Sequence, residues 1–183
     1  GRLGEILGEE ANNYNVSTVL GPAINIKRSP LCGRNFEYLS EDPYISGELG
    51  AAYIKGVQSK NVGTSVKHFA ANNQETNRFS VSEEVGERTL REIYLAGFET
   101  CVKKSAPTTI MCSYNAINGA LSSQNKWLLK DVLRDEWGYK GMVVSDWGAV
   151  YDRVKGIKAD WSLEMPYSGG HTDKDIVEAV KAG

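Results

Sequence analysis

The sequence has no apolar run that approaches the ~20 residues of a membrane-spanning helix, and it has no block of Lys and Arg. Its 21 basic and 23 acidic residues leave a formal net charge of −2, which gives no sign of a nucleic-acid partner. The three cysteines are widely spaced and form neither a disulfide framework nor a metal-ligand pattern. Two histidines are too few for a His-based metal site, and we expect neither a metal nor a cofactor. These absences leave an ordinary globular domain.

The start of the chain carries neither an initiator methionine nor a signal-like segment. Its first ten residues already have the spacing of an amphipathic helix, so we expect the chain to begin inside a larger protein. Free cysteines and the lack of a visible signal peptide favour a cytoplasmic location.

Short apolar runs alternate with helical patterns along the chain, which predicts a parallel sheet with helices outside it. The runs cover about residues 18–20, 63–70, 108–114, 142–144 and 161–166. The helices are expected at about residues 3–13, 43–60, 87–104, 125–137, 150–158 and 173–181.

The loop at residues 23–41 follows the first run and lacks the GxGxxG turn that is typical of an open doubly wound sheet. Polar residues follow every run at its C-terminal end, where the active sites of (β/α)8 barrels lie. The sequence therefore predicts an α/β fold, a partial TIM (β/α)8 barrel of about five βα units. The remaining strands, most of them N-terminal to Gly1, are expected outside the sequence.

The run at residues 142–144 ends in Ser145-Asp146-Trp147-Gly148. A carboxylate at the rim of an apolar core costs free energy unless it is paired or used. A carboxylate beside an indole is the pairing expected where a sugar ring is held and cleaved. Locally, Asp146 is equally well explained as the N-cap or turn residue of the next helix, so other strand ends must decide.

Those other strand ends carry groups that a barrel would bring to one pocket around Asp146. They are Arg34, Lys67, His68, Tyr114, Trp147 and Glu164. Arg, Lys and neutral His can donate to adjacent sugar hydroxyls, and a tyrosine hydroxyl can orient a carboxylate. Nearby cations keep a carboxylate ionised, and an ionised carboxylate can attack an anomeric carbon.

Each of these side chains also has a structural explanation. The cations could pair with acids of their own loops, and the buried groups could be barrel core. The cations are Arg34 and Lys67, with Glu37 or Glu75 as partners, and the core candidates are His68, Met111 and Tyr114. A Schiff-base lyase using Lys67 and a non-catalytic carbohydrate-binding domain also remain alternatives.

The candidate residues belong to five longer motifs: Gly33-Arg34-Asn35-Phe36-Glu37 continuing to Pro43, Lys67-His68-Phe69 with Asn72-Asn73-Gln74-Glu75, Met111-Cys112-Ser113-Tyr114-Asn115, Val144-Ser145-Asp146-Trp147-Gly148 and Leu163-Glu164-Met165-Pro166. These motifs resemble those of glycoside hydrolase family 3, the β-glucosidase and β-xylosidase family.

The resemblance implies a retaining exo-acting β-glycosidase that releases terminal β-D-glucosyl or xylosyl residues through a glycosyl-enzyme. It implies Asp146 as nucleophile, Arg34, Lys67 and His68 as sugar ligands, Met111 and Tyr114 as lining of the same subsite, and Trp147 as a platform on the leaving-group side. A β-N-acetylhexosaminidase or another specificity of the family is the alternative.

The resemblance also implies parts that residues 1–183 do not contain. Residues 1–183 are expected to be part of one N-terminal barrel domain, without a sugar-binding Asp of an earlier strand. The acid/base would come from an α/β sandwich domain that is absent from this chain. An N-acetylglucosaminidase branch uses a His-Asp pair after the Lys-His strand, and Ala70–Glu75 has no such His. We therefore expect a β-glucoside or oligosaccharide substrate, no membrane partner, and an inactive isolated chain.

Overall fold

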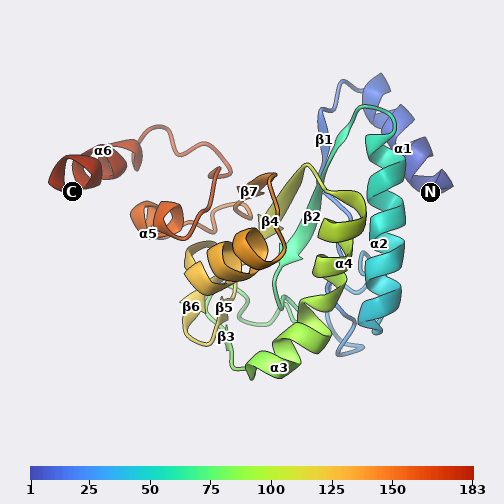
Figure 1. The fold of residues 1–183 in the computed structure, drawn as a ribbon, viewed down its shortest axis with the longest axis horizontal. Coiled ribbons are helices and arrows are strands. Elements are labelled where there is room, and N and C mark those ends of the chain that lie inside the picture. The colour runs from blue at the N-terminus through green and yellow to red at the C-terminus, as the bar shows by residue number, and fades with distance from the viewer.

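The structure, a computed structural model, describes residues 1–183 as a parallel sheet with helices packed against it (Figure 1). The four strands are β1 (Thr18–Val19), β2 (Gly63–Phe69), β4 (Thr109–Cys112) and β7 (Met142–Val144). They lie in the order β1-β2-β4-β7, which is also their order along the chain, and all neighbouring pairs are parallel. This is the α/β arrangement that the sequence predicts, an arc of a (β/α)8 barrel.

The run expected as a fifth strand, residues 161–166, forms a single parallel bridge, between Leu163 and Val144, and does not form a continuous ladder. The amide of Met165 donates to the side-chain hydroxyl of Ser145 at 2.8 Å, so a side chain replaces a ladder bond there. Pro166 follows and has no N–H to continue pairing. The segment still occupies the fifth position beside β7.

Helices separate the strands, as the sequence predicts. They are α1 (Arg2–Asn13), α2 (Pro43–Gln58), α3 (Glu87–Thr89), α4 (Ala96–Ser105), α5 (Arg153–Lys158) and α6 (Asp173–Ala182), with the π-helical segments η1 (Leu90–Tyr94) and η3 (Trp127–Glu136) and the 3-10 turn η2 (Ser122–Gln124). The helix expected over residues 87–104 is thus α3, η1 and α4 in succession, and the helix expected over residues 125–137 is η3.

Helix α2 begins as the sequence indicates, at an Asp-Pro pair. The Asp42 side chain accepts hydrogen bonds from the amides of Tyr44 (2.7 Å) and Ile45 (3.1 Å), and Pro43 occupies the first helical turn. Ile54 and Val57 are fully buried on its inner face. The helix therefore forms the outer layer over the first strands of the sheet.

The hydrophobic core lies between the sheet and its helices and contains a cluster of 22 buried residues. Phe69, at the end of β2, packs against Phe98 of α4 with ring centroids 5.2 Å apart and against Trp137 at 5.8 Å. Full burial of such a side chain contributes about 1.5–3 kcal/mol. The strand ends are therefore held on a rigid base.

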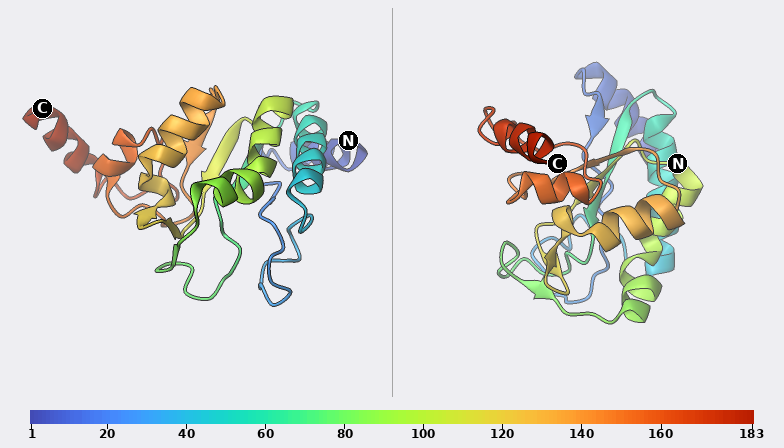
Figure 2. Two further views of the ribbon diagram at one scale, coloured as in Figure 1. Left: turned by 60° about the horizontal axis from the view of Figure 1, so that its bottom comes forward. Right: turned by 60° about the vertical axis from the view of Figure 1, so that its left-hand side comes forward.

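A second, small sheet ties two loops together at the carboxyl ends of the strands. It contains β3 (Ser82–Glu83), β5 (Ala116–Ile117) and β6 (Ala120–Leu121), in the order β3-β5-β6. Asn118 and Gly119 turn the β5-β6 hairpin with positive φ angles of 49° and 82°, the pattern of a type I′ turn. The loops that follow β1 and β2 project from the same end of the molecule (Figure 2).

The terminal helices lie at opposite ends of the molecule (Figure 1). The apolar face predicted for α6 does not reach the core, because no residue of α6 is buried. Its Ile176 and Val180 instead line a groove of about 180 Å³ against Val154 and Ile157 of α5.

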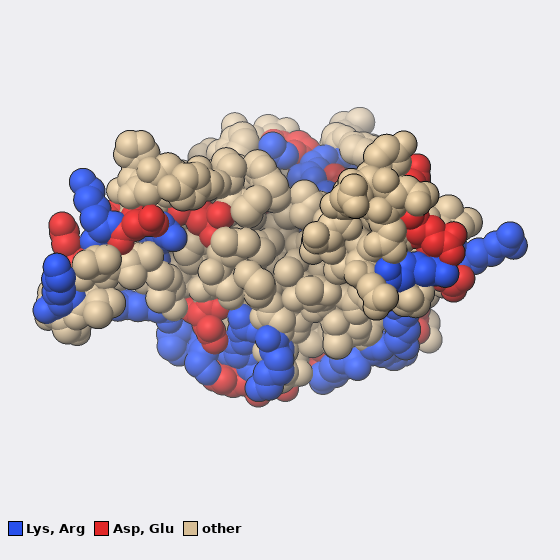
Figure 3. Space-filling view, turned by 90° about the horizontal axis from the view of Figure 1, so that it is seen from above, with Lys and Arg blue, Asp and Glu red and all other residues tan.

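Charged side chains of both signs lie around the edge of the face seen in Figure 3, with uncharged surface between them. No helix has the length and apolarity that crossing a membrane requires.

Candidate active site

Asp146 is the second residue after β7 and does not cap a helix. Its Oδ1 accepts a hydrogen bond from the amide of Trp147 at 2.7 Å, and its Oδ2 is buried without a hydrogen-bond partner. The next helix, α5, is capped by Asp152, whose side chain accepts from the amide of Lys155. The helix-cap explanation of Asp146 is therefore wrong, whereas the turn explanation holds, because the amide of Ala149 donates to the carbonyl of Asp146 at 3.0 Å. A buried carboxylate oxygen without a partner costs free energy.

The turn that presents Asp146 is fixed by the segment after it. Gly148 has a φ of 80°, a conformation that favours glycine, and its amide donates to the carbonyl of Met165 at 2.8 Å. The amide of Ser145 donates to the carbonyl of Leu163 at 3.0 Å. The carboxylate is therefore held by backbone on both sides.

His68 lies beside the free oxygen of Asp146. Its Nε2 is 3.7 Å from Asp146 Oδ2 and 2.7 Å from a terminal nitrogen of Arg34. A guanidinium only donates, so Nε2 accepts and the ring proton sits on Nδ1. Burial lowers the pKa of His68 well below its usual range, and the charges of Arg34, Lys67 and Arg78 lower it further. His68 is therefore a neutral polar group in this site.

The two expected cations meet on one carboxylate, Glu37. Arg34 Nε donates to Glu37 Oε1 at 2.5 Å, and Lys67 Nζ lies 3.2 Å from Glu37 Oε2. The pairing explanation for these cations is thus confirmed for Glu37, while Glu75 pairs with Arg78 at 2.7 Å. Arg34 also contacts His68, which itself lies 3.7 Å from Asp146, so His68 connects this ion pair to the carboxylate.

Met111 lies in β4 and Tyr114 is the second residue after it, and β4 pairs with β7, the strand that precedes Asp146. Met111 is buried and pairs with Val144 across the ladder. The Tyr114 hydroxyl donates to the carbonyl of Trp147 at 2.8 Å, and it also lies within reach of the Asp146 carboxylate, as expected. Burial and the charge of Asp146 raise the pKa of Tyr114 to about 12, so it remains a hydroxyl donor. Trp147 leaves 39% of its surface exposed.

Glu164 does not join this cluster. Its Oε2 lies 3.6 Å from Nε of Arg153 and accepts a hydrogen bond from the Thr172 hydroxyl at 3.1 Å. The expectation that it converges with the other strand ends is wrong, because α5 and the start of α6 supply its partners.

Asn25 supports the site and was missed from the sequence. It is buried in the loop after β1, where its side-chain amide donates to the carbonyl of His68 at 2.9 Å and accepts from the amide of His68 at 2.8 Å. A second missed contact is the edge of Tyr38, whose ring centroid lies 6.3 Å from that of His68. The signal that could have revealed this buried amide is the position of a polar residue between two apolar ones, Ile24 and Ile26.

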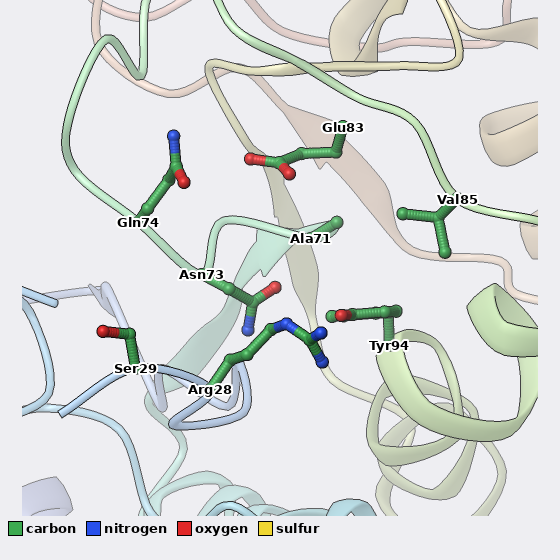
Figure 4. A pocket seen from close by; sticks show the side chains of 8 residues that line it. All are labelled: Arg28, Ser29, Ala71, Asn73, Gln74, Glu83, Val85 and Tyr94. Carbon is green, nitrogen blue, oxygen red and sulfur yellow. The ribbon is translucent and has the colours of Figure 1, made fainter.

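A separate pocket of about 180 Å³ opens between the loops that follow β1 and β2 (Figure 4). Its lining includes Arg28, Asn73, Gln74, Glu83 and Tyr94, and none of the residues around Asp146. Burial raises the pKa of Glu83, which the charge of Arg28 opposes. This pocket is distinct from the cluster around Asp146.

Residues 2–182 match the family model described as glycosyl hydrolase family 3 N terminal domain. The chain is 63% identical over 182 residues to thermostable beta-glucosidase B of Acetivibrio thermocellus, covering 100% of this chain and 24% of that protein. It is 57% identical over 182 residues to an exo-alpha-(1->6)-L-arabinopyranosidase of Bifidobacterium longum, again covering 100% of this chain and 24% of that protein.

Solved structures give the same picture. Beta-glucosidase 3B of Thermotoga neapolitana in complex with glucose superposes with a TM-score of 0.95 at 53% identity, covering 100% of this chain and 26% of that one. A beta-glucosidase of Bifidobacterium adolescentis gives a TM-score of 0.96 at 58% identity, covering 100% and 27%. The chain thus spans about a quarter of the length of the relatives it matches.

Proposed function

The chain belongs to glycoside hydrolase family 3, and we propose that the protein it comes from is a retaining exo-acting β-glycosidase that hydrolyses terminal β-D-glucosyl or xylosyl residues. The observation that carries the proposal is the buried, unpartnered Oδ2 of Asp146 beside His68. A carboxylate placed in this way is suited to attack an anomeric carbon.

In the proposed first step, Asp146 Oδ2 forms an ester bond to the anomeric carbon while the bond to the leaving-group oxygen breaks. A proton donor protonates that oxygen, and the transition state has oxocarbenium character. In the second step the same acid/base group takes a proton from a water, which attacks the same carbon and releases the carboxylate. Two inversions give overall retention.

Donors around Asp146 are arranged to hold the sugar. Lys67 and Arg34 carry three and five N–H donors, and Glu37 uses one of each in the closest contacts. The remaining N–H groups can donate to adjacent hydroxyls. Neutral His68 adds a polar contact without a charge that would compete with the oxocarbenium ion.

We propose that the acid/base is supplied by a part of the protein outside residues 1–183. Retention requires a second carboxyl roughly 5–5.5 Å from the nucleophile. The nearby acids are occupied as acceptors: Glu37 by Arg34 and Lys67, and Glu75 by Arg78. A carboxylate held by cations is a poor proton donor.

A second class of glycone should be assayed as well, because one relative, at 57% identity, is named as an L-arabinopyranosidase. Comparing kcat/KM for 4-nitrophenyl β-D-glucopyranoside and 4-nitrophenyl α-L-arabinopyranoside decides between the two. A Schiff-base lyase has less support, because the ammonium group of Lys67 pairs with Glu37.

The nucleophile is tested with a 2-deoxy-2-fluoro-β-D-glucosyl fluoride, which traps the glycosyl-enzyme. We expect peptide mass spectrometry of the full-length protein to place the label on Asp146 and Asp146→Asn to remain unlabelled. Asp152→Asn is the matched control, because Asn caps helices as well as Asp and this variant should label normally. A label on any other residue contradicts the proposal.

A further inference from the structure

The backbone of His68 is held by one side chain, that of Asn25 in the loop after β1. The amide nitrogen of Asn25 donates to the carbonyl of His68 at 2.9 Å, and its Oδ1 accepts from the amide of His68 at 2.8 Å. Both residues are buried, with 3% and 1% of their surfaces exposed. A side-chain amide carries an acceptor and N–H donors, so Asn25 takes the place of a peptide group on a neighbouring strand.

The backbone pairing on both sides of β2 stops short of His68. On one side, the last contact is the amide of Ile24, which donates to the carbonyl of Lys67 at 2.9 Å. On the other side, the register with β4 shifts between Val66 and Phe69, so His68 has no register partner there. The side-chain amide from the loop after β1 therefore makes the two hydrogen bonds that the sheet does not provide.

The imidazole ring of His68 has no hydrogen bond that would orient it from behind. Functional histidines are often oriented by a bond from Nδ1–H to a carbonyl or a carboxylate, but Nδ1 of His68 is buried without a partner. The ring instead meets the edge of Tyr38 at 73°, and the Tyr38 hydroxyl is anchored on the carbonyl of Asn72 at 3.0 Å. The position of the ring therefore depends on where the His68 backbone is held.

We infer that Asn25 is a positioning residue, which holds the backbone of His68 so that Nε2 stays between Arg34 and Asp146. Nε2 lies 2.7 Å from a terminal nitrogen of Arg34 and 3.7 Å from Asp146 Oδ2, and a shift of the backbone would change both distances. This inference rests on the proposed function. Asn25 does not touch the sugar in this account and acts only through His68.

A double-mutant cycle in the full-length protein tests whether Asn25 acts through His68, with kcat/KM for 4-nitrophenyl β-D-glucopyranoside as the readout. For Asn25→Ala we expect a loss of about 10- to 100-fold in the wild-type background, because a misplacement of about 1 Å in a site can cost about 100-fold. In the His68→Ala background no ring remains to be positioned, so the same substitution should change kcat/KM by less than about twofold. A merely structural role would give the same loss in both backgrounds.

Asn118 provides the matched control, because its side chain makes the same pair of bonds to a different backbone. It donates to the carbonyl of Val85 at 2.9 Å and accepts from the amide of Val85 at 2.8 Å. Asn118→Gly removes both bonds and suits the positive φ of 49° at this turn position. This variant should keep kcat/KM within about twofold of its parent in both backgrounds.

Melting temperatures verify that each variant folds. If Asn25→Ala does not fold, Asn25→Asp takes its place in the cycle. Its side chain has the same shape and still accepts from the amide of His68, but as a carboxylate it cannot donate to the carbonyl. Its loss of kcat/KM should likewise disappear in the His68→Ala background.

Equal losses in the two backgrounds, or a loss below about twofold in the wild-type background, overturn the positioning role and leave the proposed function intact. A folded wild-type protein that hydrolyses neither this glucoside nor 4-nitrophenyl α-L-arabinopyranoside overturns both.

Discussion

His68 gives the site a pH dependence that stability measurements can detect. Burial lowers its pKa in the folded state well below the 6.5 expected in the unfolded chain. The unfolded state therefore binds a proton below pH 6.5 that the folded state does not bind. The contribution of His68 is fully present above pH 6.5 and is lost as the pH falls, by up to about 1.4 kcal/mol per pH unit.

We expect the urea-unfolding free energy of the wild type to fall more steeply between pH 7 and pH 5 than that of His68→Gln. The second histidine, His171, is exposed in the loop before α6. His171→Gln is therefore the control and should keep the wild-type slope. Parallel pH profiles for wild type and His68→Gln would show that His68 is not held neutral by its surroundings.

For individual residues, the sequence predicted which side chains form the candidate site better than it predicted the contacts that they make. Asp146 could not be separated from a helix cap, because that decision depends on Asp152 capping α5. The contact of Asn25 with His68 joins residues 43 positions apart, and no local pattern reports such a bond. Glu37 was one of two candidate partners for Lys67, the other being Glu75, and only the loop conformation selects between them.

Among the secondary-structure elements, α2 and α4 approach so closely that glycine is needed at their crossing. A Cβ atom added at Gly47 would lie 2.8 Å from Cβ of Thr100 and 3.1 Å from Cα of Gly97. Alanine gains about 1 kcal/mol of helix propensity over glycine, but overpacking costs about 1–3 kcal/mol. Since neither neighbour is the far end of a flexible side chain, the cost should exceed the gain.

We therefore expect Gly47→Ala to lower the unfolding free energy by about 1 kcal/mol, measured by urea titration. Gly86→Ala is the matched control, because a Cβ at Gly86 meets nothing within 4 Å and its φ is −62°. The control should stay within about 0.5 kcal/mol of wild type. A stabilised Gly47→Ala variant would mean that the two helices can move apart at little cost.

Elements with a long periodic pattern were predictable, and the two-residue strands of the small sheet were not. Helix α2, which spans Pro43–Gln58, was expected at about residues 43–60. The strands β3, β5 and β6 have two residues each, too few for an alternating pattern to show. Their pairing depends on the meeting of two loops in space, which no local pattern reports.

For the whole molecule, the family and the fold class follow from the order of the strand-end motifs. What the sequence could not predict is the packing of the ends. Leu3 and Ile6 of α1 are exposed at one end of the sheet, and Val177 and Val180 of α6 at the other (Figure 1). A periodic apolar face predicts burial, but it does not say which surface covers it.

The proposed separation of the nucleophile from the acid/base also concerns the whole molecule. If the acid/base lies outside residues 1–183, no carboxylate of this chain should behave as a general acid when it is replaced. Loss of a general acid slows substrates with poor leaving groups by about 10²–10⁴-fold. It has little effect on a glycosyl fluoride, whose leaving group needs no proton.

We expect Glu37→Gln, Glu75→Gln and Glu164→Gln to lower kcat/KM for methyl β-D-glucopyranoside and β-D-glucosyl fluoride in the same proportion, each assayed in the full-length protein. Glu37 should show the largest joint loss, because both Arg34 and Lys67 depend on it for their position. Glu164→Gln should show the smallest, because its partners are Arg153 and Thr172. A loss of 100-fold or more that is confined to the methyl glucoside would identify that glutamate as the acid. The half-site assignment would then be wrong, because nucleophile and proton donor would both lie within these 183 residues.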